Sequence, residues 1–249
     1  MTAPLVIKVS GDYVEKAEVM AGLAKTVAGL AKDQSCVIVH GGGRAIDEWL
    51  RKAGIEPKFH DGLRVTDEPT LEIAEMVLSG LVNKRLVSAL LAEKVDALGL
   101  SGVDRWLIQC RPISAELGRV GQIEAVRGEV LAGLIGQGIT PVISPISAGP
   151  DGCYNVNADH AAGAVAGALS AARVIFLTNV PGVLVDGRLT ERLSQDEIHT
   201  LIEQGVINGG MIPKVSAALD ALESGAAEVM IADLKGLRSG IGTVVVRDR

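Results

Sequence analysis

Three consecutive glycines, directly after a histidine, form the part of this chain best suited to chemistry. His40 ends the short β-branched run at residues 37–39, glycines occupy residues 41–43, and a helical pattern begins at Arg44. A strand, a glycine turn and a helix start together direct backbone N–H groups and a helix dipole towards an anion. Glycine also lets the backbone approach phosphate or carboxylate oxygens closely, because it has no Cβ. The segment therefore predicts an anion site, although a βα turn without a ligand would have a similar sequence.

Two well-known nucleotide-binding loops fit this segment less well. A phosphate-binding P-loop requires G-x-x-x-x-G-K-[ST], which this sequence does not contain. The dinucleotide fingerprint G-x-G-x-x-G fits the first two glycines, but Ile46 stands at the third position. Asp61 follows about 20 residues later, as that fingerprint requires, yet it lies in a predicted turn. A nicotinamide-dependent enzyme is therefore the weaker alternative.

Two lysines stand where an ammonium group needs a partner. Lys8 interrupts the apolar strand predicted at residues 5–9, and burying a lysine without a partner is costly. It lies either on an edge strand with its ammonium in solvent, or at the carboxyl end of a central strand, where open α/β sheets bind ligands. The turn at Ser10-Gly11 favours the central position. Lys214 falls in the first turn of a predicted helix, where its charge opposes the helix dipole unless an anion lies nearby.

Polar residues also gather before the helix predicted at residues 160–169. Asn157 is a suitable N-cap, and Asp159 falls in the first turn, where a carboxylate suits the helix dipole. Capping does not account for all of them, so Asn155 and Asp159 are candidate site residues. Arg64, on a predicted hairpin, could hold a carboxylate through two hydrogen bonds or could be simply solvated.

The elements that must position these residues alternate between apolar strands and helices, which predicts an α/β fold with a mainly parallel sheet. We expect the hairpin at residues 57–65, strands at residues 5–9, 37–39, 97–100, 106–110, 120–126, 140–144, 174–177, 229–232 and 243–246, and helices at residues 14–31, 44–53, 66–93, 130–137 and 160–169, with two more beginning at Ser194 and near Gly209. The strand at residues 140–144 is expected to end at Pro145. The helix at residues 66–93 is apolar on more than one face, so it is covered either by a second subunit or within one chain.

Composition excludes several classes of function. The 249 residues carry a net charge of −6 without a run of Lys or Arg, so nucleic acid and membrane surfaces are not expected as partners. Cys36, Cys110 and Cys153 have no C-x-x-C spacing, so neither disulfides nor zinc are implied. Residues 1–4 lead directly into the first strand and leave no room for a signal peptide. No apolar run is long enough to span a membrane, so we expect a soluble, cytoplasmic protein.

Five motifs, in their order along the chain, resemble the N-acetyl-L-glutamate kinases of the amino acid kinase superfamily. They are Lys8-Val9-Ser10-Gly11, His40-Gly41-Gly42-Gly43, Asp61-Gly62-Leu63-Arg64-Val65-Thr66, Asn155-Val156-Asn157-Ala158-Asp159 and Gly209-Gly210-Met211-Ile212-Pro213-Lys214. The resemblance extends from Lys8 to about Val246. It implies a three-layer αβα sandwich with a mainly parallel central sheet. It also implies an amino-terminal lobe (residues 1–170) for the acyl amino acid and for dimerisation, and a carboxyl-terminal nucleotide lobe (residues 171–249).

The resemblance further implies a reaction and a role for each motif. MgATP would phosphorylate the side-chain carboxylate of N-acetyl-L-glutamate to an acyl phosphate, in arginine biosynthesis. Lys8 and Lys214 would stabilise the phosphoryl group, with Asp159 holding both lysines. The substrate would contact Gly41, Gly42, Arg64 and Asn155, and the N–H groups of Gly11 and Gly42 would face the phosphoryl group. Nucleotide contacts are implied for Gly11, Thr178, Asn179, Val180, Gly182, Leu184, Gly209, Gly210 and Met211. Mg²⁺ would be held mainly by the nucleotide, with Asp159 reaching it through a water.

Some residues depart from that family's pattern and leave alternatives open. Ser10 replaces the first glycine of the usual K-x-G-G, and Asn179 replaces the aspartate of [ST]-D-V-x-G. Asn179 and the segment at residues 80–85 resemble the corresponding positions of a sister kinase. The substrate of that kinase is aminoadipate or glutamate linked to a small acidic carrier protein. An acidic chain suits an acidic protein substrate poorly. A non-catalytic, ligand-binding member of the fold is a third possibility.

The expected oligomer is a homodimer formed through the doubly apolar helix at residues 71–91. Arginine-inhibited members of the resembled family carry an extra amino-terminal helix that links dimers into hexamers. Residues 1–4 are too few for two helical turns. We therefore expect an activity that does not respond to arginine.

Overall fold

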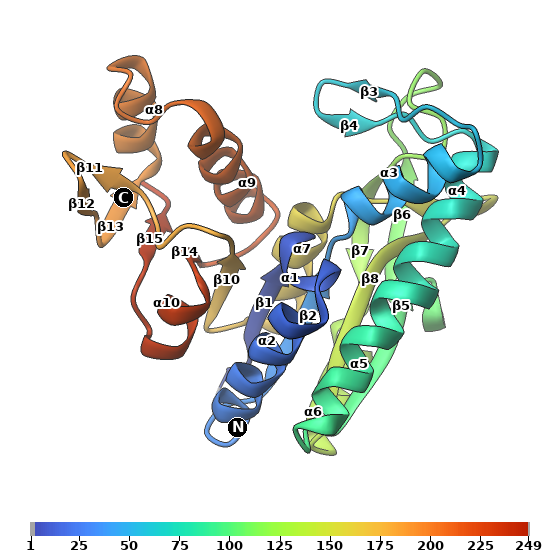
Figure 1. Ribbon diagram of the computed structural model, residues 1–249, viewed down its shortest axis with the longest axis horizontal. Coiled ribbons are helices and arrows are strands. Elements are labelled where there is room, and N and C mark those ends of the chain that lie inside the picture. The colour runs from blue at the N-terminus through green and yellow to red at the C-terminus, as the bar shows by residue number, and fades with distance from the viewer. Residues whose placement is uncertain (1–2, 249) are drawn as a thin grey trace.

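Strands β1 (Leu5–Val9) and β2 (Cys36–His40) lie side by side in the middle of one large sheet. Both are largely buried on both faces, as expected of parallel strands covered by helices. The computed structural model, drawn in Figure 1, describes residues 3–248. Met1 and Thr2, part of the segment in which no signal peptide was expected, therefore lie outside the described residues.

The sheet is mainly parallel, as the sequence predicted. Its eleven strands follow the order β13-β15-β14-β10-β1-β2-β8-β6-β7, with β5 and β9 also paired to β8. Only β14–β15, β6–β7 and β8–β9 are antiparallel among the described pairs of this sheet. The further strands are β5 (Ala97–Gly102), β6 (Ile108–Pro112), β7 (Gly121–Val126), β8 (Thr140–Gly149), β9 (Gly152–Asn155), β10 (Arg173–Leu177), β13 (Arg192–Ser194), β14 (Glu228–Ala232) and β15 (Thr243–Val246). Two hairpins stand apart, β3 (Phe59–His60) with β4 (Leu63–Arg64) and β11 (Leu184–Val185) with β12 (Arg188–Leu189).

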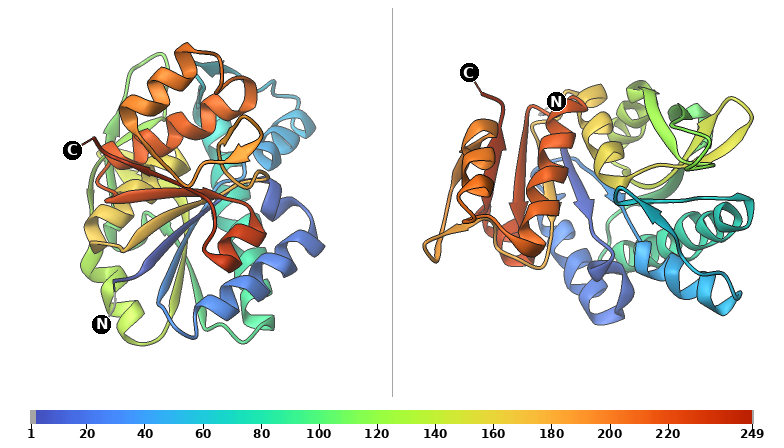
Figure 2. Two further views of the ribbon diagram at one scale, coloured as in Figure 1. Left: turned by 90° about the vertical axis from the view of Figure 1, so that its left-hand side faces the viewer. Right: turned by 90° about the horizontal axis from the view of Figure 1, so that it is seen from above.

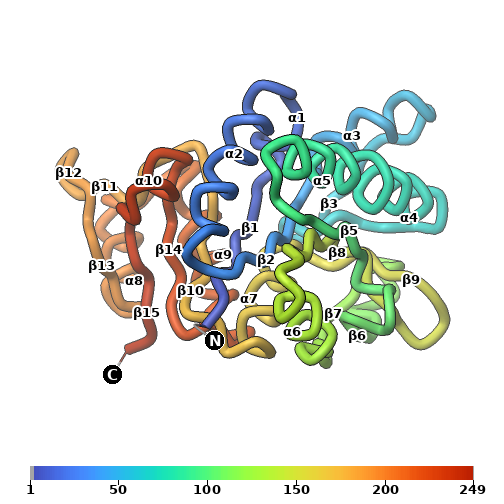
Figure 3. Tube along the Cα trace, turned by 90° about the horizontal axis from the view of Figure 1, so that it is seen from below, coloured from blue at the N-terminus to red at the C-terminus, as the bar shows by residue number. Residues whose placement is uncertain are grey.

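Helices cover both faces of the sheet, which confirms the predicted three-layer αβα sandwich (Figure 3). On one face lie α1 (Asp12–Glu15), α2 (Ala17–Leu30), α3 (Gly43–Lys52), α4 (Glu68–Glu75), the π-helical segment η1 (Met76–Val82), α5 (Asn83–Ala92) and α10 (Leu234–Ser239). On the other lie α6 (Gly128–Gly136), α7 (Ala158–Leu169), α8 (Gln195–Glu203) and α9 (Ile212–Glu223), and short 3₁₀ turns occupy η2 (Asp104–Trp106) and η3 (Gly209–Met211). Within the described part of the chain, no helix combines the length and hydrophobicity needed to cross a bilayer.

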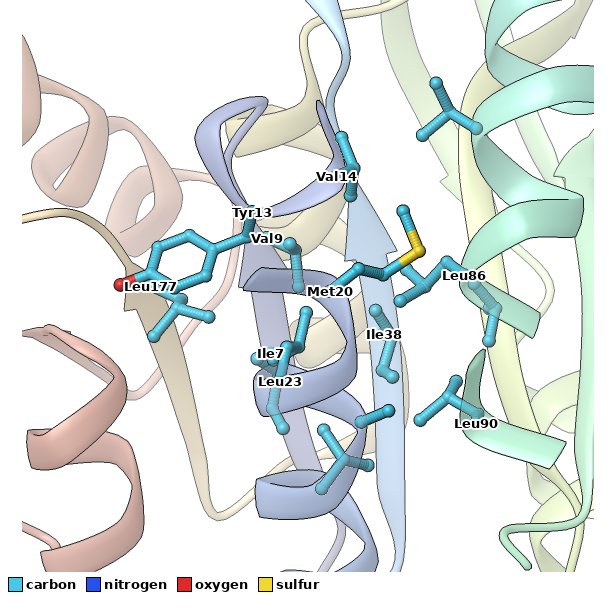
Figure 4. Close-up of a cluster of buried hydrophobic side chains, with 14 of the residues drawn as sticks. Ile7, Val9, Tyr13, Val14, Met20, Leu23, Ile38, Leu86, Leu90 and Leu177 are labelled. Atoms are coloured by element: carbon cyan, nitrogen blue, oxygen red, sulfur yellow. The ribbon is translucent and has the colours of Figure 1, made fainter. Parts of the chain in front are cut away.

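Alternation along β1 decides which way Lys8 points. Ile7 and Val9 pack with Met20 and Leu23 of α2 on one face (Figure 4). Each such buried aliphatic side chain contributes about 1.5–3 kcal/mol. Because side chains alternate along a strand, Lys8 points to the opposite face, which α7 covers.

Helices α7 and α9 cross closely, although α7 covers β1, β2 and β10 in the middle of the sheet and α9 covers β14 and β15 near one end. A Cβ on Gly163 of α7 would lie 2.7 Å from the Cα of Ala221 of α9, and one on Gly167 would lie 3.1 Å from the Cα of Gly225. Glycine permits this backbone-to-backbone approach because it has no side chain. The crossing joins the carboxyl-terminal part of the chain, drawn in orange and red in Figure 2, to the rest of the molecule.

Strand β8 does not end at Pro145, as we expected from the sequence, but continues to Gly149. Its pairing with β5 is irregular at this point, since Ser101 pairs with Ser144 and the next residue of β5 pairs with Ser147. Proline lacks an N–H group and is tolerated in a sheet at such irregular positions. The Pro145 carbonyl instead accepts a hydrogen bond from Val156 N–H at 3.0 Å.

Two predicted helices are interrupted. The expected helix at residues 14–31 is divided into α1 and α2 at Lys16, whose backbone is extended. The expected helix at residues 66–93 runs from Glu68 to Ala92, but the wider π-helical turns of η1 separate α4 from α5. A 3.6-residue periodicity cannot reveal a local change of helix type.

Candidate active site

A cavity of about 290 Å³ lies where β1 and β2 end and α7 begins. Among the predicted site residues, its lining includes Lys8, Gly11, Gly41, Gly42, Arg64, Asn155 and Asp159. These residues come from four segments of the sequence. Because β1 and β2 are parallel neighbours, the loops that follow them meet at the same edge of the sheet.

Lys8 and Asp159 form an ion pair at the floor of this cavity. Lys8 lies on a central strand, so the prediction of a central rather than an edge position is confirmed. Its Nζ is 2.6 Å from Asp159 Oδ1, and the two side chains are 15% and 18% exposed. Asp159 stands in the first turn of α7, and its N–H donates to the side chain of Asn157, the predicted N-cap. The carboxylate therefore benefits from the helix dipole and holds a half-buried cation in place.

The sequence left open whether Arg64 binds a carboxylate or is simply solvated. In the structure its side chain is buried. Its Nη1 is 2.5 Å from Asp47 Oδ1, its Nη2 donates to the Gly43 carbonyl at 3.1 Å, and its guanidinium lies 4.8 Å from the centre of the Phe59 ring. The side chain is 7% exposed. Asp47 thus fixes the guanidinium at the wall of the cavity, where its remaining N–H groups can receive an anion.

Asn155 is held beside Arg64 through a buried threonine. Its Nδ2 donates to Thr66 Oγ1 at 3.3 Å, and that hydroxyl donates to the Arg64 carbonyl at 2.8 Å. The backbone N–H of Asn155 donates to the Arg119 carbonyl at 2.9 Å. The amide group of Asn155 is therefore positioned by β9 and by the segment that carries Arg64.

The two loops that follow β1 and β2 contribute backbone donors. Gly41 N–H donates to the Val9 carbonyl at 2.9 Å, which ties the glycine loop to β1. Among residues 3–248, no backbone carbonyl accepts a hydrogen bond from the N–H groups of Gly11 and Gly42. A Cβ on Gly42 would lie 2.8 Å from a terminal methyl group of the buried Leu78, so any other residue here would require Leu78 to shift. The two N–H groups are available to an anion.

The residues predicted to contact a nucleotide lie outside this cavity, apart from Gly11. Thr178 directly follows β10, and its carbonyl accepts a hydrogen bond from the hydroxyl of Tyr13 at 2.7 Å. Gly182 has a backbone φ of 149° and lies against Thr243, whose hydroxyl accepts a hydrogen bond from Val183 N–H. Asn179, Leu184, Gly209 and Gly210 are exposed, while Val180 and Met211 are half-buried. The loops after β10 and before α9 therefore offer an open surface, with Tyr13 connecting it to the loop after β1.

Lys214 does not join Lys8 in this arrangement. Its Nζ donates to the Gly210 carbonyl at 2.9 Å, and in the described part of the chain the ion pair of Asp159 is with Lys8. A contact between Asp159 and Lys214 stays a prediction.

Sequence reasoning missed several residues that support the site, among them Asp47, Tyr13, Thr66 and Asn83. Asp47 lies one helical turn after the glycine loop, on the same helix, and this spacing was the available signal for it. Tyr13 and Asn83 reach the site only through tertiary contacts, and the bond from Asn155 to Thr66 is also a tertiary contact. Together, a held ammonium, a held guanidinium and free N–H donors form a site for a substrate with more than one negative charge.

Comparisons with known proteins agree with this chemistry. A model of the Amino acid kinase family matches residues 3–233. An acetylglutamate kinase of Roseiflexus sp. (strain RS-1) is 51% identical, over 98% of this chain and 94% of the relative. An acetylglutamate kinase of Methanopyrus kandleri is 45% identical, over 96% of this chain and 99% of the relative.

A solved structure is similar over almost the whole chain as well. The N-acetylglutamate synthase from Neisseria gonorrhoeae, complexed with coenzyme A and N-acetyl-glutamate, matches with a TM-score of 0.84 at 26% identity. The match covers 99% of this chain and 60% of that one. The similarities therefore include both the cavity and the helices beyond it.

Proposed function

This chain belongs to the amino acid kinase family, and on that premise we propose that it transfers the terminal phosphoryl group of MgATP to the side-chain carboxylate of N-acetyl-L-glutamate. The predicted family, fold and kinase activity are confirmed by relatives named acetylglutamate kinase that are 45–51% identical over nearly the full chain. The product would be N-acetyl-L-glutamyl 5-phosphate, an intermediate of arginine biosynthesis. The cavity that unites Lys8, Arg64 and Asp159 is the structural observation that carries the proposal.

The acceptor would bind between Arg64 and Asn155. We infer that the guanidinium of Arg64, fixed by Asp47, binds the α-carboxylate, and that Asn155 hydrogen bonds to the acetamido group. A free α-ammonium group would be repelled by this guanidinium and could not replace the acetamido group. Free glutamate should therefore be a very poor substrate.

Phosphoryl transfer requires positioning and charge stabilisation rather than a covalent catalyst. Lys8 and the N–H groups of Gly11 and Gly42 would stabilise the negative charge of the phosphoryl group. The acceptor carboxylate is already ionised at neutral pH, so no general base is needed. Lys214 would supply a second ammonium once it leaves the Gly210 carbonyl.

The nucleotide would bind on the carboxyl-terminal lobe, which we assign to residues 171–249, with the acceptor lobe at residues 1–170. Thr178, Asn179, Val180, Gly182 and Leu184 would border it on one side, and Gly209, Gly210 and Met211 on the other. The described residues hold no group of three or more His, Cys, Asp or Glu side chains suited to a metal ion. Mg²⁺ would be held mainly by the phosphates, with Asp159 reaching it through a water, and would add positive charge there.

A homodimer is the expected assembly, and the face formed by η1, α5 and β5 would form its interface. Met76, Leu91 and Leu98 on this face are 64%, 52% and 41% exposed. Large exposed side chains beside an edge strand suit a two-fold contact between copies of the chain. Light scattering should give twice the chain mass of 25.8 kDa. A value equal to one chain would exclude this assembly.

An assay of ADP release tests the proposed activity directly. The acceptors to compare are N-acetyl-L-glutamate, glutamate, N-acetylaspartate and aspartate, with MgATP in excess. We expect turnover with N-acetyl-L-glutamate and very little with the others. Turnover of free glutamate at a comparable rate would overturn the assignment.

The two alternative functions receive less support. The segment at residues 80–85 suggested a carrier-linked substrate, but its Asn83 is fully buried and hydrogen bonds inside the protein. The segment thus has a structural role that needs no carrier protein. A non-catalytic role does not explain why Lys8 and Asp159 form an ion pair in the cavity.

A further inference from the structure

The side chain of His40 lies directly beneath the glycine loop and contacts it. The imidazole is fully buried. Its Nδ1 is 3.0 Å from the carbonyl oxygen of Gly41, and its Nε2 is 3.1 Å from Nδ2 of Asn83. The imidazole thus connects the loop to the first residue of α5.

The partners of this imidazole determine which nitrogen carries the proton. A carbonyl oxygen only accepts hydrogen bonds, so Nδ1 must be the donor to Gly41. Nε2 is then the acceptor, and Asn83 Nδ2 donates to it. The orientation of the Asn83 amide is fixed independently, because Nδ2 also donates to the Val142 carbonyl at 2.9 Å and Oδ1 accepts from Lys84 Nζ at 3.1 Å. Every group then has a suitable partner with a neutral imidazole.

The π-helical segment η1 supports the same loop from the side. Its Leu78 packs against Gly42, and its Ser79 hydroxyl is 2.8 Å from the hydroxyl of Ser144 on β8. Asn83 follows this segment directly. A π-helical turn holds more residues than an α-helical turn, so it changes the faces on which the following residues lie. Because of η1, Leu78 can contact the glycine loop while Asn83 contacts His40.

We propose that the His40–Asn83 pair is a positioning device, which holds the Gly41 carbonyl beneath the loop and so keeps the Gly42 N–H directed into the cavity. The Gly41 carbonyl and the Gly42 N–H belong to one trans peptide unit, in which they point in opposite directions. A peptide between two glycines rotates easily. If it rotated, the carbonyl oxygen would face the anionic substrate. The role in catalysis rests on the proposed phosphoryl transfer, in which this N–H stabilises negative charge.

Two substitutions of His40 provide a matched test. In His40→Asn, the side-chain amide nitrogen lies close to the place of Nδ1 and can still donate to Gly41. In His40→Gln, it lies close to the place of Nε2 and cannot. With MgATP and N-acetyl-L-glutamate, we expect His40→Asn to keep kcat within about threefold and His40→Gln to lower it about tenfold or more. KM for N-acetyl-L-glutamate should change less than kcat, and thermal melting should establish that both variants are folded. Equal kcat values in two folded variants would overturn the proposal.

A spectroscopic measurement on the unaltered protein separates this proposal from the proposed function. Long-range ¹H–¹⁵N correlation spectra of histidine show which ring nitrogen carries the proton, and they need no substrate. We expect the proton of His40 on Nδ1 at neutral pH, and a proton on Nε2 would overturn the proposal even if His40→Gln is inactive. If the spectra place the proton on Nδ1 but N-acetyl-L-glutamate is not phosphorylated, the proposed function fails while the hydrogen-bond arrangement stands.

Discussion

Acidification from about pH 7.5 to about pH 5 should destabilise this protein by about 2 kcal/mol more than it destabilises the His40→Asn variant. Burial lowers the pKa of His40 from its ordinary value of 6.5 to about 4, and the nearby charge of Lys84 acts in the same direction. The hydrogen bond to the Gly41 carbonyl opposes both, since it favours the protonated ring. The folded protein therefore binds this proton much less readily than the unfolded chain does.

The direction and size of the effect follow from these two pKa values. Above pH 6.5 the imidazole is neutral in both states, and the full stability is present. As the pH falls from 6.5 towards 4, the unfolded chain takes up the proton and the folded protein does not, so stability is lost. The complete loss is about 3.4 kcal/mol, at about 1.36 kcal/mol for each pKa unit, and about 2 kcal/mol of it is reached at about pH 5.

Urea unfolding followed by circular dichroism measures this difference. The free energy of unfolding of both proteins would be determined at the two pH values. Other titrating groups are shared by both proteins and cancel in the comparison. If the two proteins lose the same stability on acidification, the imidazole is not held neutral by its surroundings, and the reasoning from burial fails.

Three further substitutions test the site and its support. Lys214→Ala should lower kcat by about two to three orders of magnitude, with little change in KM for the acceptor, if this lysine acts only on the transition state. Asp47→Asn should raise KM for N-acetyl-L-glutamate about tenfold, because Arg64 loses the charge that orients it. Steady-state kinetics measures kcat and KM of both of these variants. Gly163→Ala should reduce the free energy of unfolding by about 1–3 kcal/mol in urea, because the added methyl group must separate α7 from α9.

Matched controls distinguish these effects from general damage. Glu48 is a neighbour of Asp47 on α3, but it forms an exposed pair with Lys52, so Glu48→Gln should leave KM unchanged. Gly133 of α6 has nothing within 4 Å of an added Cβ, so Gly133→Ala should not destabilise the protein. Near-normal kcat in Lys214→Ala would mean that this lysine is only a surface charge. Equal effects of the two glycine substitutions would mean that the α7–α9 crossing is not tightly packed.

The parts of the site that the sequence predicted are those governed by local rules. Lys8 in an apolar strand, and Asn157 and Asp159 at a helix start, follow from side-chain alternation and capping, and the structure has them as expected. The pairing of Arg64 with Asp47 and of His40 with Asn83 could not be predicted in this way. The latter two residues are 43 positions apart, and only the packing of α5 on the sheet brings them together.

Dependence on tertiary packing also explains why some elements were predicted incorrectly. Pro145 marks an irregular position in β8, not its end, because the neighbouring strand skips it. The segment at residues 80–85 resembles that of a kinase with a different substrate, and its buried asparagine hydrogen bonds to His40. A short motif indicates that a position is constrained, but the constraint can come from packing or from a ligand, and the sequence alone does not distinguish them.

A small rotation at the crossing of α7 and α9 would move Lys214 by several ångströms. Asp159 lies at the amino end of α7 and Lys214 at the amino end of α9, while the helices touch further along, at Gly163 and Ala221. At a rise of about 1.5 Å per residue, Lys214 is about 10 Å from that contact. A rotation of about 20° there would move its backbone by about 3–4 Å, a distance comparable with one hydrogen bond. If the two predicted lobes pivot at this contact, Lys214 moves relative to Asp159 without any element unfolding.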